Sequence, residues 1–449
     1  MSRIRIIITI IVVVLTTLLT GCTGKEPNEI AYVVALGIDS TDDDNYKITI
    51  QYANPTQISG GASESGGKAG SEIVDNVTIA PNIYAGVGLA NNIVSKSFSM
   101  SHAKLIVFSK EIAEKGVKDM IETLVRSEEI RPDVFIAVAN TTANDYLTSV
   151  NPEMEVNPAQ YYQLIYQKNQ LVGIPDGQLR EFFTGLYTDN YDSILPVAGV
   201  IEGAGGNSQN DDKGQSKDGQ NEGSEGSSES LDSFESKSSD DKDENEKEKD
   251  AEKNTSKYEY DIKNYVGGET AIEKKNKAEA IGAAVFEKDK MVGELGEVET
   301  EICKMLKGDY TYSYLTYYNN DTPDIPITVK TTQQKKPKYK IDTDKKTVDI
   351  ELYIESDLYS LPADYNVENK IEDFERDVAN YTSSTCTKFI NNFTKKYNSD
   401  ILKLNEKVKY KFLTNNQYNW FKKNVGWSEY KFSVCTNFKV RRTGLIVRE

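Results

Sequence analysis

The sequence predicts a multi-domain α+β protein with mixed, mostly antiparallel sheets, packed helices and a long disordered acidic insert. Apolar residues alternate with polar ones in some stretches, which is typical of half-buried strands. In others they recur every three or four residues, which is typical of helices. Both patterns occur on either side of residues 202–257. Within that segment, Leu231 and Phe234 are the only large apolar residues. A chain of 449 residues favours two or three domains.

Before the acidic segment, the elements are short and of both kinds. The apolar run 31–38 and the alternating run 46–52 flank the turn sequence DSTDDDN, which predicts an antiparallel hairpin. Its aspartates, Asp42 to Asp44, are consecutive and lack the alternate spacing of a calcium loop, so they indicate a solvated turn. Strands are also expected at 105–108 and 134–138, and helices after Ser109, over 117–124 and over 158–170.

After the acidic segment, the same mixture returns. We expect two strands around a charged turn at 282–295, a helix over 296–309 closed by Gly308, a strand at 348–354, helical spacing from 367 to 397, and a strand at 432–440. The helical stretch is either one long helix or two helices broken near the sequence TSST at 382–385.

The acidic charge of the chain is concentrated in one segment. The whole chain has a formal charge of −17, and residues 203–256 contribute 16 acidic residues and 7 lysines to it. A segment so poor in apolar side chains cannot offset the entropy cost of folding, which predicts disorder. The expected domains are a signal peptide (1–21), an N-terminal α+β part (22–201), the insert (202–257) and a C-terminal α+β part (258–449), with a small middle domain as a further option.

The N-terminus carries the most specific signal. Two arginines, Arg3 and Arg5, precede a short apolar run over 6–19, whereas a membrane-spanning helix needs about 20 apolar residues. The run ends in the sequence LTGC, residues 19–22, which has the form of a bacterial lipobox. We therefore predict cleavage before Cys22 and lipid on its sulfur. A plain signal peptide or a short anchor helix with a chance cysteine are the alternatives.

The residues give little sign of catalysis, and no metal or cofactor site is predicted. The single histidine, His102, leads into a strand and is assigned a structural role. Cys303, Cys386 and Cys435 are far apart and form no CxxC pair, so they are expected to be reduced packing residues, with Cys435 on the polar side of its strand. The absence of a basic stripe argues against a nucleic-acid partner. Arg441 and Arg442 are assigned to the ordinary surface, with lipid headgroups or a partner carboxylate as the alternative.

Taken in order, the motifs resemble the C-subunit family of spore germinant receptors, the GerAC type. The resemblance rests on the lipobox followed by these stretches: NEIAYVVALGID (28–39), the Y-x-I-x-I-Q strand (46–51), SKSFSMSHAKLIVFSKEIAEKG (95–116), RSEEIRPDVFIAVAN (126–140), GAAVFEKDKMVGEL (282–295), DILKLNE (400–406), Trp420, Trp427 and KVRRTGL (439–445). The chain departs from the family pattern at Thr23–Lys25, at Lys403 and Asn405 where the family turn carries glycines, and in its acidic insert.

The resemblance implies a lipoprotein on the outer face of the spore inner membrane, with fatty acyl chains such as palmitate on Cys22. It also implies A and B subunits as partners, a nutrient ligand bound by the complex, and no catalytic activity. The alternative function is an extracytoplasmic substrate-binding lipoprotein of a transporter. A cell-wall hydrolase is disfavoured by the lone histidine.

Overall fold

The computed structural model describes residues 3–9, 29–53, 73–152, 158–167, 173–188, 190–201, 264–270, 276–318, 326–360, 370–397 and 399–443. Cys22 and the predicted disordered segment 202–257 lie outside these residues. Residues 1–204 and 263–449 belong to one compact unit. Among the helices that the structure describes, none combines the length and the apolar character needed to span a bilayer.

The first sheet has nine strands in the order β3-β2-β1-β5-β6-β7-β8-β9, with β4 added to the start of β1. Its centre, β1-β5-β6-β7, is parallel, and its flanks are antiparallel. The strands are β1 (Ile30–Ser40), β2 (Tyr46–Ala53), β3 (Ile73–Ala80), β4 (Ser97–Ser99), β5 (Leu105–Ser109), β6 (Phe135–Ala139), β7 (Ile194–Val200), β8 (Ala278–Glu287) and β9 (Lys290–Leu295).

Both faces of the parallel centre are covered by helices. Strands β5 and β6 are buried at every position and apolar except for Ser109 at the end of β5, as expected for parallel strands between two helical layers. The helices of this part are α3 (Ile83–Asn91), α4 (Lys110–Lys115), α5 (Lys118–Val125), α6 (Ala143–Ser149), α7 (Pro158–Gln167) and α8 (Leu179–Thr188). Side chains of α3, α4, α5 and α8 pack on one face, and those of α6 and α7 pack on the other.

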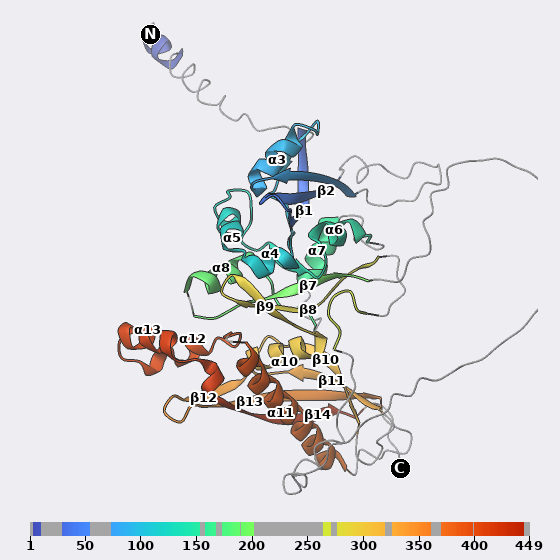
Figure 1. Ribbon diagram of the computed structural model, residues 1–449, viewed down its shortest axis with the longest axis vertical. Coiled ribbons are helices and arrows are strands. Elements are labelled where there is room, and N and C mark those ends of the chain that lie inside the picture. The colour runs from blue at the N-terminus through green and yellow to red at the C-terminus, as the bar shows by residue number, and fades with distance from the viewer. Residues whose placement is uncertain are drawn as a thin grey trace, which may run out of the picture. The chain divides into compact units, whose positions relative to one another are not determined.

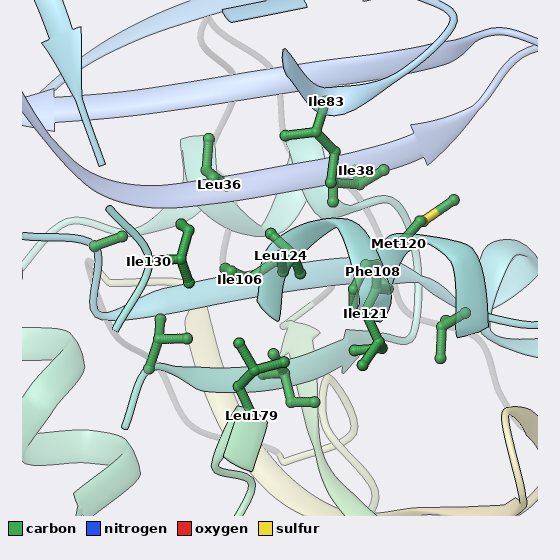
Figure 2. Packing of buried hydrophobic residues seen from close by; sticks show 14 of the residues in the cluster. Leu36, Ile38, Ile83, Ile106, Phe108, Met120, Ile121, Leu124, Ile130 and Leu179 are labelled. Atoms are coloured by element: carbon green, nitrogen blue, oxygen red, sulfur yellow. The ribbon is translucent and has the colours of Figure 1, made fainter. Parts of the chain in front are cut away.

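Figure 2 shows the first of these two cores. Leu36, Ile106 and Phe108 project from the sheet toward Ile121 and Leu124 of α5, and all five side chains are fully buried. Helix α4 begins where the sequence indicates, because the Ser109 hydroxyl accepts the amide of Ile112.

The second sheet has five strands, with β13 at its centre. One edge of β13 pairs with β11 and β12, and the other pairs in parallel with β14. The elements are α10 (Glu297–Lys307), β10 (Tyr312–Tyr318), β11 (Pro326–Gln333), β12 (Lys338–Asp342), β13 (Thr347–Ser360), α11 (Ile371–Lys396), α12 (Leu404–Val408), the 3₁₀ turns η4 (Lys409–Lys411) and η5 (Trp427–Glu429), α13 (Asn415–Asn424) and β14 (Lys431–Arg442). Figure 1 shows α11 lying along β14.

The predicted fold class is confirmed, since the molecule is α+β with mixed sheets and packed helices. The first hairpin is confirmed by the pairing of Leu36 with Ile50, and the two strands at 282–295 are β8 and β9. The helical stretch is one helix, α11, which continues through TSST. The domain boundaries remain a prediction. Strands β8 and β9, which follow the acidic segment, pair onto β7 in the first sheet.

Candidate functional site

The predicted lipidation residue, Cys22, lies outside the described residues, and the first described residue after it is Glu29, directly before β1. Residues 3–9 are helical and exposed. Lipidation at Cys22 therefore remains a prediction from the sequence.

His102 lies at the surface beside its own neighbour. Its Nδ1 is 3.0 Å from the Ser101 hydroxyl, and its ring centroid lies 4.5 Å from that of Tyr32 in an edge-on arrangement. Within the described part of the chain, no carboxylate bonds to this imidazole, so the serine and histidine lack the third group that orients a catalytic base.

The three remaining cysteines are free thiols in two different environments. Cys303 and Cys386 are buried, and burial raises the pKa of each thiol to about 12, which keeps them protonated and unreactive. Cys435 is exposed on β14, on the polar side that the alternating pattern indicates. Arg441, on the same strand, forms an ion pair with Glu355 at 3.1 Å.

A cluster of polar groups lies where the ends of α8 and of β8 meet the segment that follows α11. A cleft of about 600 Å³ opens here, and its lining includes Asp192, Lys288, Asp400, Asn405, Lys423 and Trp427. The volume falls in the range of small-molecule sites. Lys288, Asp400, Asn405 and Trp427 all fall within the stretches that carry the family resemblance, but no local pattern marks Asp192.

Asp192 joins three separate segments. One carboxylate oxygen accepts the amide of Lys288 at 3.0 Å, in the turn between β8 and β9, and the other accepts the amide of Asp400 at 2.8 Å. Burial raises the pKa of this carboxyl, against the two amide bonds that favour its charge. Asp192 therefore fastens the start of β7 to both the β8–β9 turn and the segment after α11.

Asp400 holds the next turn in place. Its two oxygens accept the amides of Leu404 and Asn405, each at 2.8 Å, at the start of α12. Burial raises the pKa of Asp400 to about 7, the two amide bonds oppose this, and the nearby charge of Asp192 adds to it. Because both carboxylates are occupied by backbone amides, they shape loops and are poorly placed to take a proton from a substrate.

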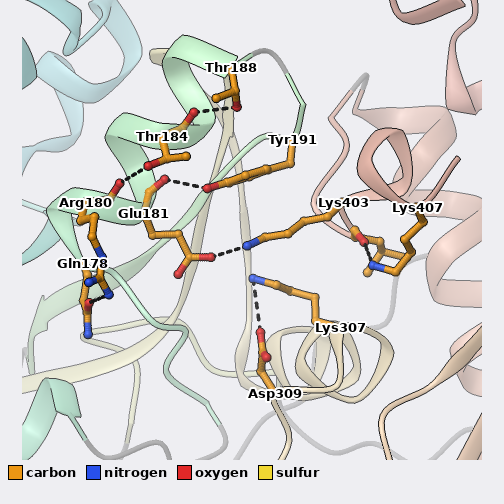
Figure 3. A network of polar contacts seen from close by, with 11 residues as sticks. Gln178, Arg180, Glu181, Thr184, Thr188, Tyr191, Lys307, Asp309, Lys403 and Lys407 are labelled. Atoms are coloured by element: carbon orange, nitrogen blue, oxygen red, sulfur yellow. Dashed lines mark hydrogen bonds and ion pairs between the residues drawn. The ribbon is translucent and has the colours of Figure 1, made fainter. Parts of the chain in front are cut away.

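Lys403 extends this network to α8, as Figure 3 shows. Its ammonium group pairs with Glu181 at 2.6 Å and lies 4.2 Å from the ring centroid of Tyr191. The Tyr191 hydroxyl donates to the backbone carbonyl of Glu181 at 3.0 Å. The backbone of Lys403 has φ 57° and ψ 39°, the left-handed conformation that glycine adopts most readily. This is the position where the resemblance leads us to expect glycine.

Two of the lysines that line the cleft have ammonium groups without an ion-pair partner among the described residues. Lys288 and Lys423 form no ion pair within the described residues, and the Trp427 indole donates to the Asn405 side chain at 3.2 Å. The cleft thus offers ammonium groups beside an aromatic surface, which suits a small molecule with a carboxylate.

Comparisons with known proteins match both halves of the chain. Residues 24–200 match the spore germination protein N-terminal domain, and residues 281–444 match the family described as spore germination B3/GerAC like, C-terminal. The chain is 26% identical over 176 residues to spore germination protein KC of Bacillus subtilis (strain 168), covering 36% of this chain and 43% of that protein. It is 30% identical over 146 residues to putative spore germination protein YfkR of the same strain, covering 32% and 37%.

These alignments span less than half the length of each relative. A crystal structure of the GerBC protein aligns over 90% of this chain and 96% of that chain, with 15% identity and a TM-score of 0.48. With both of its halves matched in order, the chain belongs to the C-subunit family of spore germinant receptors.

Proposed function

We propose that this chain is the lipid-anchored C subunit of a spore nutrient germinant receptor, acting without catalysis on the outer face of the spore inner membrane. The observation that carries the proposal is the order of three features. A lipobox ends at Cys22, the first family domain begins to match at residue 24, and the second follows after the acidic segment. The body would thus begin almost immediately after the lipid.

The anchor would decide where the body works. Two acyl chains hold a protein on a bilayer stably, whereas one chain gives only marginal binding. A subunit confined to the membrane plane meets membrane-embedded A and B subunits at a high effective concentration, so that small interfaces suffice for assembly. The nutrient would then be bound by the complex.

The polar groups of the described residues support a role without catalysis. The carboxylates of Asp192 and Asp400 are occupied by backbone amides, and the thiols of Cys303 and Cys386 are buried with raised pKa values. These groups organise turns and cores. Non-enzymatic signalling through assembly is the function that such a body supports best.

The test replaces the lipid sulfur. Cys22→Ala is expected to remove the protein from the spore membrane fraction and to abolish the response to nutrients, while spores still form. Cys435→Ala is the matched control, because it removes an exposed thiol of the body and leaves the lipobox intact. A Cys22→Ala protein that stays in the membrane fraction would contradict the anchoring proposal.

Assembly needs a separate measurement. A tagged chain solubilised in mild detergent from spore membranes is expected to bring down one transporter-like membrane protein and one larger multi-span protein. Recovery of the chain alone, under conditions in which those two proteins remain associated with each other, would argue against its place in the receptor.

A second candidate function rests on the cleft. Its volume of about 600 Å³ suits a small ligand, and its Lys288 and Lys423, which form no ion pair with any described residue, suit a carboxylate, as in a substrate-binding lipoprotein. Isothermal titration calorimetry of the full-length protein with amino acids and sugars tests this function. The double variant Lys288→Ala/Lys423→Ala is expected to lose any such binding. Micromolar binding by the parent protein that is lost in the double variant would favour this function. If the parent protein binds none of these ligands, this function is ruled out.

A further inference from the structure

Helix α3 presents an outward face without a single charge. Ile83, Val87 and Ala90 point into the core, whereas Tyr84 and Leu89 are 38% and 48% exposed. Ile93 follows the helix and is 74% exposed. We call Tyr84, Leu89 and Ile93 the α3 face. Surface helices of soluble proteins ordinarily carry charged residues on the side away from the core, so this face is unusual.

The lack of acidic residues extends well beyond the helix. Residues 76–110 contain no aspartate and no glutamate, although the chain has 70 acidic residues in 449 and would average about five in a stretch of that length. The charged residues of this stretch are Lys96, Lys104 and Lys110. From outside it, the carboxylate of Glu129 reaches in and accepts the amide of Met100 at 2.7 Å; it keeps its charge and lies close enough to act electrostatically on Tyr84.

The α3 face lies at the end of the sheet where the chain enters it. Strand β4 pairs in parallel with β1, so that Ser97 lies opposite Ile30. The Asn91 side chain at the end of α3 accepts the amide of Phe98 at 2.8 Å, which fixes the C-terminal end of the helix to β4. Figure 1 shows α3 beside this end of β1. Leu89 and Ile93 therefore lie near the start of β1.

The predicted lipid is attached only a few residues before that point. Ile30 is eight residues after Cys22, and an extended chain spans at most about 3.5 Å per residue, which limits the separation to roughly 28 Å. With lipid on Cys22, the end of the sheet that carries the α3 face would therefore lie within reach of the bilayer.

We infer that the α3 face rests on the lipid surface, with Leu89 and Ile93 entering the headgroup boundary, and that it orients the body on the membrane. This inference rests on the proposed anchoring at Cys22. Two apolar side chains bind a bilayer weakly by themselves, but the tether makes the contact intramolecular and keeps the face within reach.

The experiment places a fluorescent probe on the α3 face of the acylated full-length protein in vesicles of phosphatidylcholine. Ile93→Cys is labelled in a Cys435→Ser background, because the other two thiols are buried and Cys22 is occupied by lipid. Leu413→Cys is the matched control, since Leu413 is also apolar and is 95% exposed. Brominated phosphatidylcholine is the quencher.

We expect bromolipid to quench the probe at position 93 several-fold more than the probe at position 413, with little change when anionic lipid is added. Equal quenching at the two positions, in protein that floats with the vesicles, overturns the docking inference and leaves the anchoring proposal standing. Protein that carries no lipid and fails to float overturns both. A position-93 probe shielded only when the membrane subunits are present assigns the face to a protein partner and rejects the lipid contact.

Discussion

Lys403 combines a costly backbone conformation with a useful side chain. The left-handed conformation costs a residue with a Cβ about 1–2 kcal/mol. The pair with Glu181 is partly exposed, at 27% and 31%, so solvent screening limits it to under about 1 kcal/mol. The contact with the Tyr191 ring adds a similar amount, about 0.5–1 kcal/mol. The strain and the contacts are therefore nearly balanced.

This balance predicts different outcomes for two truncations. Lys403→Ala keeps the strain and loses both contacts, so the free energy of unfolding should fall by about 1 kcal/mol. Lys403→Gly loses the same contacts but relieves the strain, so it should stay within about 0.5 kcal/mol of the parent protein. Urea denaturation measures both, and Glu181→Gln supplies the double-mutant cycle. If Lys403→Ala proves as stable as Lys403→Gly, the strain argument is wrong.

The buried carboxyl of Asp400 links stability to pH. Burial raises its pKa from 3.8 to about 7, so the folded protein holds a proton that the unfolded chain releases near pH 4. Between these values the folded state binds more protons, and stability falls as the pH rises. Glu301, also buried, has a pKa raised to about 7 and acts in the same direction.

We therefore expect the free energy of unfolding to decline from pH 5 to pH 7.5. In Asp400→Asn this decline should be shallower, because the carboxyl that must ionise is gone. The variant should also lose about 1–3 kcal/mol at pH 5, since the amide can accept only one of the two backbone N–H groups. Glu301→Gln serves as the comparison for a second buried carboxyl. An unchanged slope in Asp400→Asn would show that its pKa is not raised.

At the scale of elements, α11 completes the edge of the second sheet. Strand β14 pairs with β13 on one side, and on the other its amides meet polar side chains of the helix. Thr387 accepts the amide of Val434 at 3.0 Å, Ser383 that of Thr436 at 2.9 Å, and Asn391 that of Phe432 at 3.1 Å. The helix thereby satisfies backbone groups that an uncovered edge would offer to another strand.

A neighbouring pair of serines tests this arrangement. Ser383→Ala leaves the buried amide of Thr436 without an acceptor and should lower the free energy of unfolding by about 1–3 kcal/mol. Ser384→Ala, on the exposed side of the helix, should change it by less than about 0.5 kcal/mol. Hydrogen exchange of the Thr436 amide should speed up in the first variant only. Slow exchange in both would mean that the hydroxyl does not protect the strand.

Helix α11 and the strands beside it show what hydrophobic periodicity in the sequence can and cannot predict. Apolar spacing located α11, β13 and β14, because each has one apolar face. It did not reveal the parallel pairing of β13 with β14 or of β1 with β5, since register depends on partners far along the chain. Asp192 was missed for the same reason: its hydrogen bonds join residue 192 to residues 288 and 400, and no local pattern records them.

At the scale of the whole molecule, the acidic segment interrupts one sheet without separating its strands. Beside the interruption, the Ile201 amide donates to the carbonyl of Lys277 at 2.9 Å, as β7 pairs with β8. Gly199 and Gly267 also approach so closely that a Cβ on Gly199 would overlap the Gly267 backbone. The described residues on either side of the acidic segment thus lie side by side, so a short connection would be enough to join them.

Replacing residues 205–262 with a ten-residue Gly/Ser linker should consequently leave the fold intact. Closing a shorter loop costs less entropy, which predicts a gain of about 1.5 kcal/mol in the free energy of unfolding by the loop-length rule. A variant with the same segment in scrambled order keeps length and charge, and it should match the parent protein. Urea denaturation of the three proteins separates the possibilities. A large loss of stability in both variants would mean that the native order of this segment contributes packing, against the disorder that its composition predicts.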